Sequence, residues 1–131
     1  MLTDAFNINT AGALMVAQAF VPLLAKAKPG PARIVNVSSG LGALENMVNS
    51  CTAYSLSKSA LNAVTRQLAS ALADKKIIVN SVCPGWCRTE MGGENAPRSP
   101  QEGAEGIVWV ATEAPAEKTG LFWRDHQPIP W

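Results

Sequence analysis

The sequence carries almost no net charge. Its 11 basic and 10 acidic side chains give +1 at pH 7 over 131 residues. A chain without an excess of positive charge has no strong electrostatic attraction to nucleic acid or to an anionic membrane surface, so we expect neither as a partner. Apolar residues make up 47% of the chain, which suits a globular protein of one domain.

Cysteine and histidine are scarce. Cys51, Cys83 and Cys87 are odd in number and lack the paired spacing of a zinc site, so we expect no metal and no disulfide framework. Free thiols are typical of a reducing compartment, and we expect a cytoplasmic protein. The single histidine, His126, has no catalytic partner near it in the sequence, and we expect it to be solvated.

Long uninterrupted apolar runs are also absent. Residues 11–24 are largely apolar, but no basic segment precedes them, and Gln18 and Pro22 interrupt the run. The run is too short to span a bilayer, so we expect no membrane insertion. We interpret residues 4–26 as a helix of the folded protein. Its predicted buried stripe is Ala11, Leu14, Ala17, Val21 and Leu24.

Buried-type strands alternate with amphipathic helices along the rest of the chain. Apolar and β-branched runs predict strands at 33–37, 77–82 and 120–123, followed by a proline-rich tail, and helical spacing predicts helices over 52–73 and 99–114. This order predicts right-handed crossovers and a parallel sheet covered on both faces, with a ligand outside the carboxyl ends of the strands. The expected buried face of the helix over 52–73 is Leu61, Val64, Leu68, Ala71 and Leu72.

One pair of side chains on that helix could take part in catalysis. Tyr54 and Lys58 are four residues apart, so their side chains share a helix face. A phenol is a poor proton donor at neutral pH because its unperturbed pKa is about 10. A neighbouring cation favours the phenolate and can lower that value by roughly 1 to 3 pH units. The pair is suited to general acid/base catalysis; the alternative is a lysine that only covers the ring.

Three further motifs accompany the pair in a fixed order. Asn9 lies within Asn-Ile-Asn-Thr-Ala-Gly, Ser39 ends Ile-Val-Asn-Val-Ser-Ser, and Pro84 opens Pro-Gly-Trp-Cys-Arg-Thr. In this order the motifs resemble those of the short-chain dehydrogenase/reductase family. With Ser-Pro-Gln-Glu-Gly-Ala-Glu at 99–105, the chain is most similar to the NADPH-dependent carbonyl reductase branch. The resemblance implies the C-terminal half of a Rossmann-like, doubly wound α/β sheet with about three parallel strands and flanking helices.

The resemblance also implies a role for each motif. Tyr54 would protonate the carbonyl oxygen of a small substrate, and Ser39 would donate a hydrogen bond to the same oxygen. Lys58 would assist Tyr54, and both would contact the coenzyme, NADP or alternatively NAD. Asn9 would anchor a water that leads protons to Lys58. The remaining residues would shape the nicotinamide site or wall the substrate pocket: Pro84, Gly85 and Thr89 the former, Trp86 and Met91 the latter.

Each of these residues has a simpler interpretation when taken alone. Ser39 could cap a turn, Asn9 could be an amide on a helix surface, and Thr89 could be an ordinary loop hydroxyl. Trp86 could be a packing residue. These alternatives stay open on sequence grounds.

The first half of the family has no counterpart here. The sequence contains no glycine-rich turn of the kind that receives a pyrophosphate at a helix N-terminus. We therefore expect residues 1–131 to form a single partial Rossmann-like domain, with the outer edge of the strand at 33–37 facing water. Two functions stay open: the catalytic half of an NAD(P)-dependent carbonyl reductase, or a non-catalytic remnant. The remnant would associate with itself or a partner chain through that edge or the first two helices.

Overall fold

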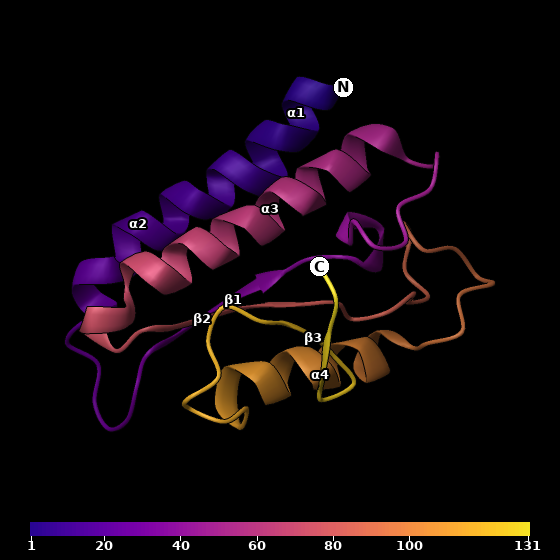
Figure 1. The fold of residues 1–131 in the computed structure, drawn as a ribbon. Coiled ribbons are helices and arrows are strands. Elements are labelled where there is room, and N and C mark those ends of the chain that lie inside the picture. The colour runs from indigo at the N-terminus through magenta and orange to yellow at the C-terminus, as the bar shows by residue number, and fades with distance from the viewer.

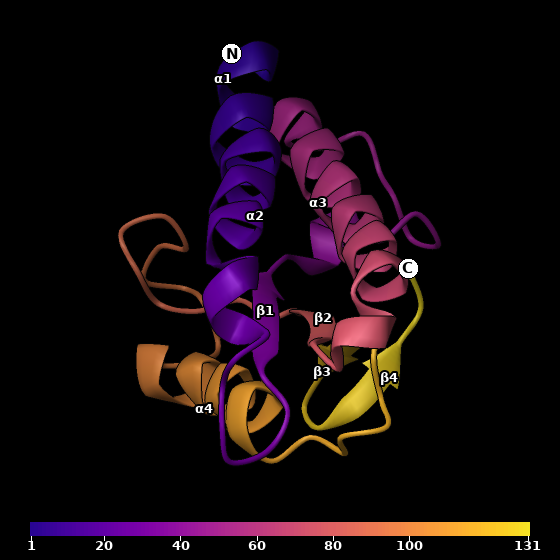
Figure 2. The ribbon, with the colours of Figure 1, turned by 90° about the vertical axis from the view of Figure 1, so that its left-hand side faces the viewer.

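A computed structural model describes all 131 residues as a layered α/β fold, with helices on both faces of one sheet (Figure 1). Helices α2 and α3 lie side by side on one face, and α4 covers the other (Figure 2). The expected α/β architecture is therefore confirmed. In chain order the elements are α1 (Leu2–Phe6), η1 (Asn7–Ala11), α2 (Gly12–Leu24), β1 (Arg33–Val37), η2 (Gly40–Gly42), α3 (Thr52–Ala71), η3 (Ala73–Lys75), β2 (Ile78–Val82), α4 (Pro100–Thr112), β3 (Phe122–Arg124) and β4 (Gln127–Ile129).

The sheet has the strand order β1-β2-β3-β4. The first three strands are parallel, as expected, and β4 runs antiparallel to β3. Residues 127–129 of the proline-rich tail therefore form a fourth strand, which was not among the predicted strands. Pro128 made a strand unexpected in this segment. An edge strand tolerates proline because one side of the strand forms no hydrogen bonds with a neighbouring strand. At the other edge, no strand of this chain pairs with the outer side of β1, as the sequence predicts.

The turn between β3 and β4 corrects the prediction for His126. Its ring stacks on Trp109 with the centroids 4.3 Å apart, and its Nε2 lies 2.8 Å from Oε1 of Glu105. His126 is therefore half-buried against α4 rather than solvated. The contact partners come from a helix about twenty residues earlier, so the local sequence gave no sign of them.

The first helix is as long as predicted, but it begins and ends two residues earlier than the predicted range of 4–26. Together α1, η1 and α2 form one helix over Leu2–Leu24, which is long and apolar enough to cross a membrane by length and composition alone. The sequence argument concerned only the apolar run at 11–24, whereas the helix as a whole passes this test of length and composition. Only 11% of the most apolar 18-residue stretch of this helix is buried. Large apolar side chains are exposed along it: Ile8, Met15, Val16, Phe20 and Leu23.

The core consists of apolar clusters on the two faces of the sheet. On one face four of the five predicted stripe residues of the first helix are confirmed, since Ala17 is buried and Leu14, Val21 and Leu24 pack around it, whereas Ala11 is not part of this cluster. The facing residues come from α3, β2 and the segments beside them: Leu68, Ala69, Leu72, Ile77 and Val79. On the opposite face α4 contributes Val110, which packs with Val82 and Trp123.

One residue expected on the buried face of α3 is misplaced. Ala71 is exposed, whereas Ala69 is buried. The buried side of the helix is centred on Leu61, Thr65 and Leu68, and at about 100° per residue Ala71 falls outside that arc.

A small polar network lies inside this core. The Thr65 hydroxyl accepts a hydrogen bond from Nδ2 of Asn36 at 2.9 Å and lies 2.7 Å from the Ser81 hydroxyl. It is also 3.0 Å from the carbonyl of Leu61, one turn earlier. Thr65 and Ser81 are fully buried and Asn36 nearly so. The network fixes α3 over β1 and β2 because each buried polar group needs its partner.

Replacing Thr65 with valine keeps the shape and removes the shared hydroxyl. We expect the free energy of unfolding to fall by about 1 to 3 kcal/mol, because the Asn36 amide loses its acceptor in a buried position. Chemical denaturation measures this. The matched control is Thr112→Val on α4, where an exposed hydroxyl makes the same bond to the carbonyl four residues earlier. Equal stability of the two variants would show that the network contributes nothing.

Candidate active site

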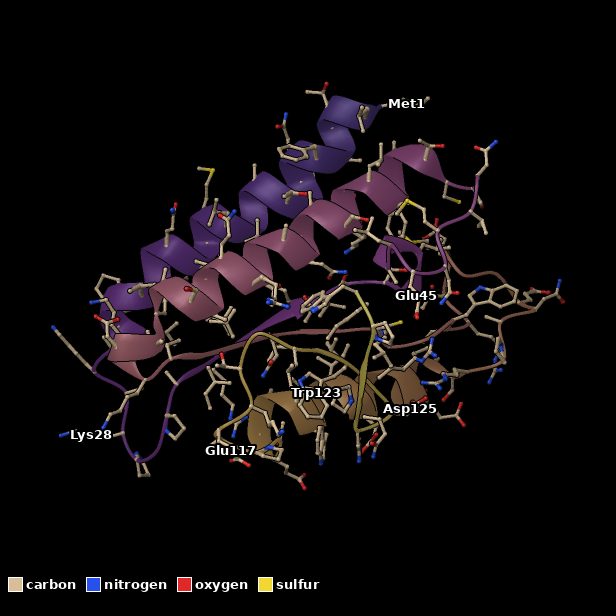
Figure 3. All side chains as sticks on the ribbon, in the orientation of Figure 1. Met1, Lys28, Glu45, Glu117, Trp123 and Asp125 are labelled. Carbon is tan, nitrogen blue, oxygen red and sulfur yellow. The ribbon has the colours of Figure 1, made fainter.

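Predicted site residues from separate segments meet at one edge of the sheet. β1 and β2 end in register, Val37 opposite Val82, and their carboxyl ends lie on the same side as the first turns of α3 and α4 (Figure 1). Glu45 lies near the carboxyl ends of the strands, whereas Lys28 lies at the opposite end of the sheet (Figure 3). We call this edge the carboxyl rim. Ser39 follows β1 directly, and Pro84 and Gly85 follow β2.

Lys58 joins α3 to the end of β1. Its Nζ donates a hydrogen bond of 2.9 Å to the carbonyl oxygen of Val37 and lies 5.6 Å from the centroid of the Tyr54 ring. Burial lowers the pKa of Lys58 below its ordinary value, because the partly buried ammonium loses some of its hydration. An ammonium has three donors, so two remain for other partners. Lys58 therefore contacts the face of the Tyr54 ring, as in the simpler interpretation of a lysine that covers the ring.

Tyr54 stands in the first turn of α3, which begins after Cys51 in a left-handed conformation (φ 48°). The side chain is half-buried, at the border of a depression lined by Met1, Leu2 and residues 51–54. Its ring is therefore neither enclosed in the core nor free of the protein.

Ser39 occupies the turn that links β1 to η2. Its Oγ accepts a hydrogen bond of 3.2 Å from the backbone N–H of Leu41, so it does cap a turn, as the simpler interpretation proposed. A hydroxyl has one donor and two acceptor positions. Capping uses an acceptor and leaves the proton available, so the cap and a hydrogen bond to a substrate oxygen are compatible.

The loop after Ser39 approaches α3 closely at Gly42. A Cβ on Gly42 would lie 2.7 Å from Cβ of Lys58, a distance that no side chain tolerates. The carbonyl of Gly42 accepts a hydrogen bond of 2.8 Å from the Ser59 hydroxyl. Ser38 adds a weaker link, since its Oγ lies 3.5 Å from the Lys58 carbonyl. These contacts hold the Ser39 turn against the helix face that carries Lys58.

Asn9 lies in η1, a π-helical turn within the first helix. The side chain is half-buried and its Nδ2 donates to Oγ of Ser57 at 3.0 Å, so it faces α3 rather than the surface. Thr10 donates from its hydroxyl to the Ser57 carbonyl at 2.8 Å, and Ser57 in turn donates to the carbonyl of Tyr54 at 2.7 Å. Asn9 is thereby fixed beside the helix turn that separates Tyr54 from Lys58.

The other predicted residues lie in the loop after β2, which we call the rim loop (residues 84–98). Trp86 is 58% exposed and its Nε1 donates to the Gly92 carbonyl at 2.8 Å, so it is not a core residue. The Thr89 hydroxyl accepts a hydrogen bond of 3.1 Å from the backbone N–H of Gly92, and Met91 is 85% exposed. The side chains of Trp86 and Thr89 bond within the loop and make no hydrogen bond to α3.

Several residues that build the site went unnoticed in the sequence. Gly42 and Ser57 act through contacts with segments far away in the chain, as do Arg98 and Asp125, which fasten the rim loop. The Arg-Ser-Pro sequence at Arg98 marked only the start of a helix. No short-range signal points to such long-range partners, because glycine, serine and charged residues are equally common in solvated loops.

A family model and two known relatives are consistent with the short-chain dehydrogenase family. The family model described as short chain dehydrogenase matches residues 2–100. The chain is 37% identical to the short-chain dehydrogenase anuI of Penicillium roqueforti over 95% of this chain and 54% of that protein. It is 46% identical to rabbit (Oryctolagus cuniculus) carbonyl reductase [NADPH] 1 over 61% of this chain and 31% of the relative.

A solved structure shows the same arrangement. The carbonyl reductase Sniffer of D. melanogaster superposes with a TM-score of 0.89 at 35% identity, over 99% of this chain and 57% of the other. The chain thus spans about half the length of the anuI and Sniffer proteins, and less of the rabbit relative. The match of the family model to most of the chain, the order of the motifs and the shared fold together show that this protein belongs to the short-chain dehydrogenase family.

Proposed function

We propose that this chain carries the catalytic half of an NAD(P)-dependent oxidoreductase that reduces a ketone, aldehyde or quinone to an alcohol. The observation that carries the proposal is the Lys58 ammonium, held on the Val37 carbonyl at 2.9 Å and 5.6 Å from the centre of the Tyr54 ring. The relatives named as carbonyl reductases support the substrate class. All three cysteines have free thiols, which suits a protein that works in the reducing cytoplasm.

The donors at the carboxyl rim fit the nicotinamide end of a dinucleotide. Lys58 keeps two N–H donors for ribose hydroxyls after bonding Val37, and the Thr89 hydroxyl proton is available for a carboxamide. Pro84 and Gly85 would form the wall between them. We propose NADPH as the coenzyme, because the rabbit relative is named for it, with NADH as the alternative to be compared. When bound, the reduced nicotinamide supplies the hydride.

The side chains of this chain would manage the proton. Ser39 would donate its hydrogen bond to the substrate carbonyl oxygen, which gains negative charge as the carbon is reduced. Tyr54 would then give its phenolic proton to that oxygen. The Lys58 cation favours the phenolate that remains, so it makes this transfer easier. Asn9, fixed on Ser57, would hold a water from which protons return toward Lys58. Trp86 and Met91, both exposed on the rim loop, would cover the substrate.

A second candidate function is association without catalysis, and one set of observations favours it. β1 has an unpaired outer edge, and a groove of about 740 Å³ lies between this strand and the first helix. Apolar residues of the helix border it, including Val16 and Phe20, which are 60% and 53% exposed. An unpaired edge beside apolar side chains favours pairing with another chain. Micromolar binding of NADPH by this chain would speak against this candidate.

Tyr54→Phe tests the catalytic proposal directly. The chain is incubated with NADPH and reactive ketones or quinones, and coenzyme oxidation is followed by absorbance. We expect turnover to fall by a hundred- to ten-thousandfold in the variant, which is the usual contribution of a general acid.

The control is Leu56→Ala, which changes an exposed side chain on the same turn of α3 and should leave turnover unchanged. Turnover that survives Tyr54→Phe would remove Tyr54 from the mechanism. Absence of turnover in the parent chain, together with absence of NADPH binding, would favour the association function.

The lowered pKa of Lys58 predicts a pH dependence of stability. In the window between the lowered pKa and 10.5, the unfolded chain binds more protons at this residue than the folded chain, so stability rises with pH. At a pH below the lowered pKa, Lys58 is charged in the folded chain as well, and the whole cost of burying this charge lowers the free energy of unfolding. We expect the parent chain to gain stability relative to Lys58→Met as the pH rises toward 10.5. Denaturation of both proteins at several pH values measures the difference, and a constant difference would contradict the burial of this charge.

A further inference from the structure

The turn between β3 and β4 has an unusual backbone. Asp125 and His126 both have positive φ, 51° and 62°, and they form a two-residue hairpin connection in which most side chains are strained. Each of the two residues makes a long-range contact. His126 contacts Glu105 on α4, and Asp125 contacts Arg98 at the end of the rim loop. The turn is thus tied to two separate segments.

Arg98 holds the turn with both ends of its guanidinium. Its Nη1 donates to Oδ1 of Asp125 at 2.7 Å and its Nη2 to Oδ2 at 2.6 Å, the paired geometry in which arginine binds a carboxylate most specifically. The hydrogen bond with Arg98 holds the pKa of Asp125 below its ordinary value, so the carboxylate stays charged at neutral pH. Both side chains remain partly exposed.

The same arginine closes the rim loop. The backbone N–H of Arg98 donates to the Trp86 carbonyl at 3.2 Å, and its carbonyl accepts from the N–H of Arg88 at 2.8 Å. The guanidinium also donates to the Pro84 carbonyl at 3.2 Å. One residue therefore joins the beginning of the loop, its end and the β3–β4 turn.

The arginine also accounts for Gly85. That residue has a φ of 81°, and a Cβ there would lie 2.8 Å from Nε of Arg98. The side chain of Arg98 passes across the place that a larger residue would occupy. The positive φ favours glycine in the Pro-Gly-Trp motif, and a larger residue there would also force the end of the Arg98 side chain to move.

We infer that Arg98 and Asp125 are positioning residues that hold Trp86, Thr89 and Met91 at the carboxyl rim. The pair lies outside the proton-transfer group, because Tyr54 and Lys58 both stand on α3 rather than on the rim loop. The inference rests on the proposed function for what the loop covers, namely the coenzyme and a carbonyl substrate. The contact between the rim loop and the β3–β4 turn does not depend on the proposed function.

Hydrogen exchange measured by mass spectrometry tests the contact on the chain without any ligand. Asp125→Asn removes the charge and keeps a residue that tolerates positive φ. We expect the amides of Arg88, Gly93 and Arg98 to exchange faster by up to about fivefold, the upper end of the range for loss of a partly exposed ion pair, while those of β1 and α3 stay unchanged. Arg98→Lys, which keeps the charge but loses the paired geometry, should give an intermediate rate.

Glu105→Gln is the matched control. It alters the other anchor of the same turn and should leave exchange in the rim loop unchanged. Equal exchange in Asp125→Asn and Glu105→Gln would overturn the inference.

The positioning role has its own measurement. In the NADPH-dependent reaction, Asp125→Asn should raise KM for the carbonyl substrate about fivefold and leave kcat within twofold, because the proton donors are not attached to the loop. Faster exchange with an unchanged KM, or a loss confined to kcat, would contradict positioning. Lack of turnover in the parent chain would instead contradict the proposed function, and the exchange experiment would still decide whether the contact holds the loop.

Discussion

The hydrogen bond from the Lys58 ammonium to the Val37 carbonyl is the contact on which the proposed site depends. It joins the first turns of α3 to the end of β1, and so relates the phenol of Tyr54 to the turn that carries Ser39. The close approach of Gly42 to Lys58 makes this junction possible. The ammonium is partly buried, which lowers its pKa, and the strand carbonyl offsets part of the lost hydration.

The carboxyl rim combines two parts with different construction. The α3 side is fixed by hydrogen bonds that range from the buried Thr65 network in the core to the partly buried bond from Asn9 to Ser57. The rim loop is held by partly exposed contacts centred on Arg98 and Asp125, and its Met91 side chain reaches into solvent. In the proposed site, the side chains that would handle the proton stand on the α3 side, and those that would cover the substrate stand on the rim loop.

Sequence reasoning predicted the elements better than it predicted their partners. The three parallel strands and the face of the first helix follow from periodicity, which local residues determine. The β3–β4 hairpin was missed because Asp125 and His126 replace the usual glycine in the turn and Pro128 lies in the strand. The contacts of Arg98 were also out of reach, since they join residues 27 positions apart. The roles of the motif residues came from the resemblance to a family rather than from spacing.

A crystal structure of this protein with a small ketone tests the central claim most directly. The account predicts that the Tyr54 and Ser39 hydroxyls both lie within about 2.6 to 3.2 Å of the ketone oxygen, with Nζ of Lys58 still on the Val37 carbonyl. A Tyr54 hydroxyl turned away from Ser39, or a Lys58 side chain detached from the end of β1, would contradict it.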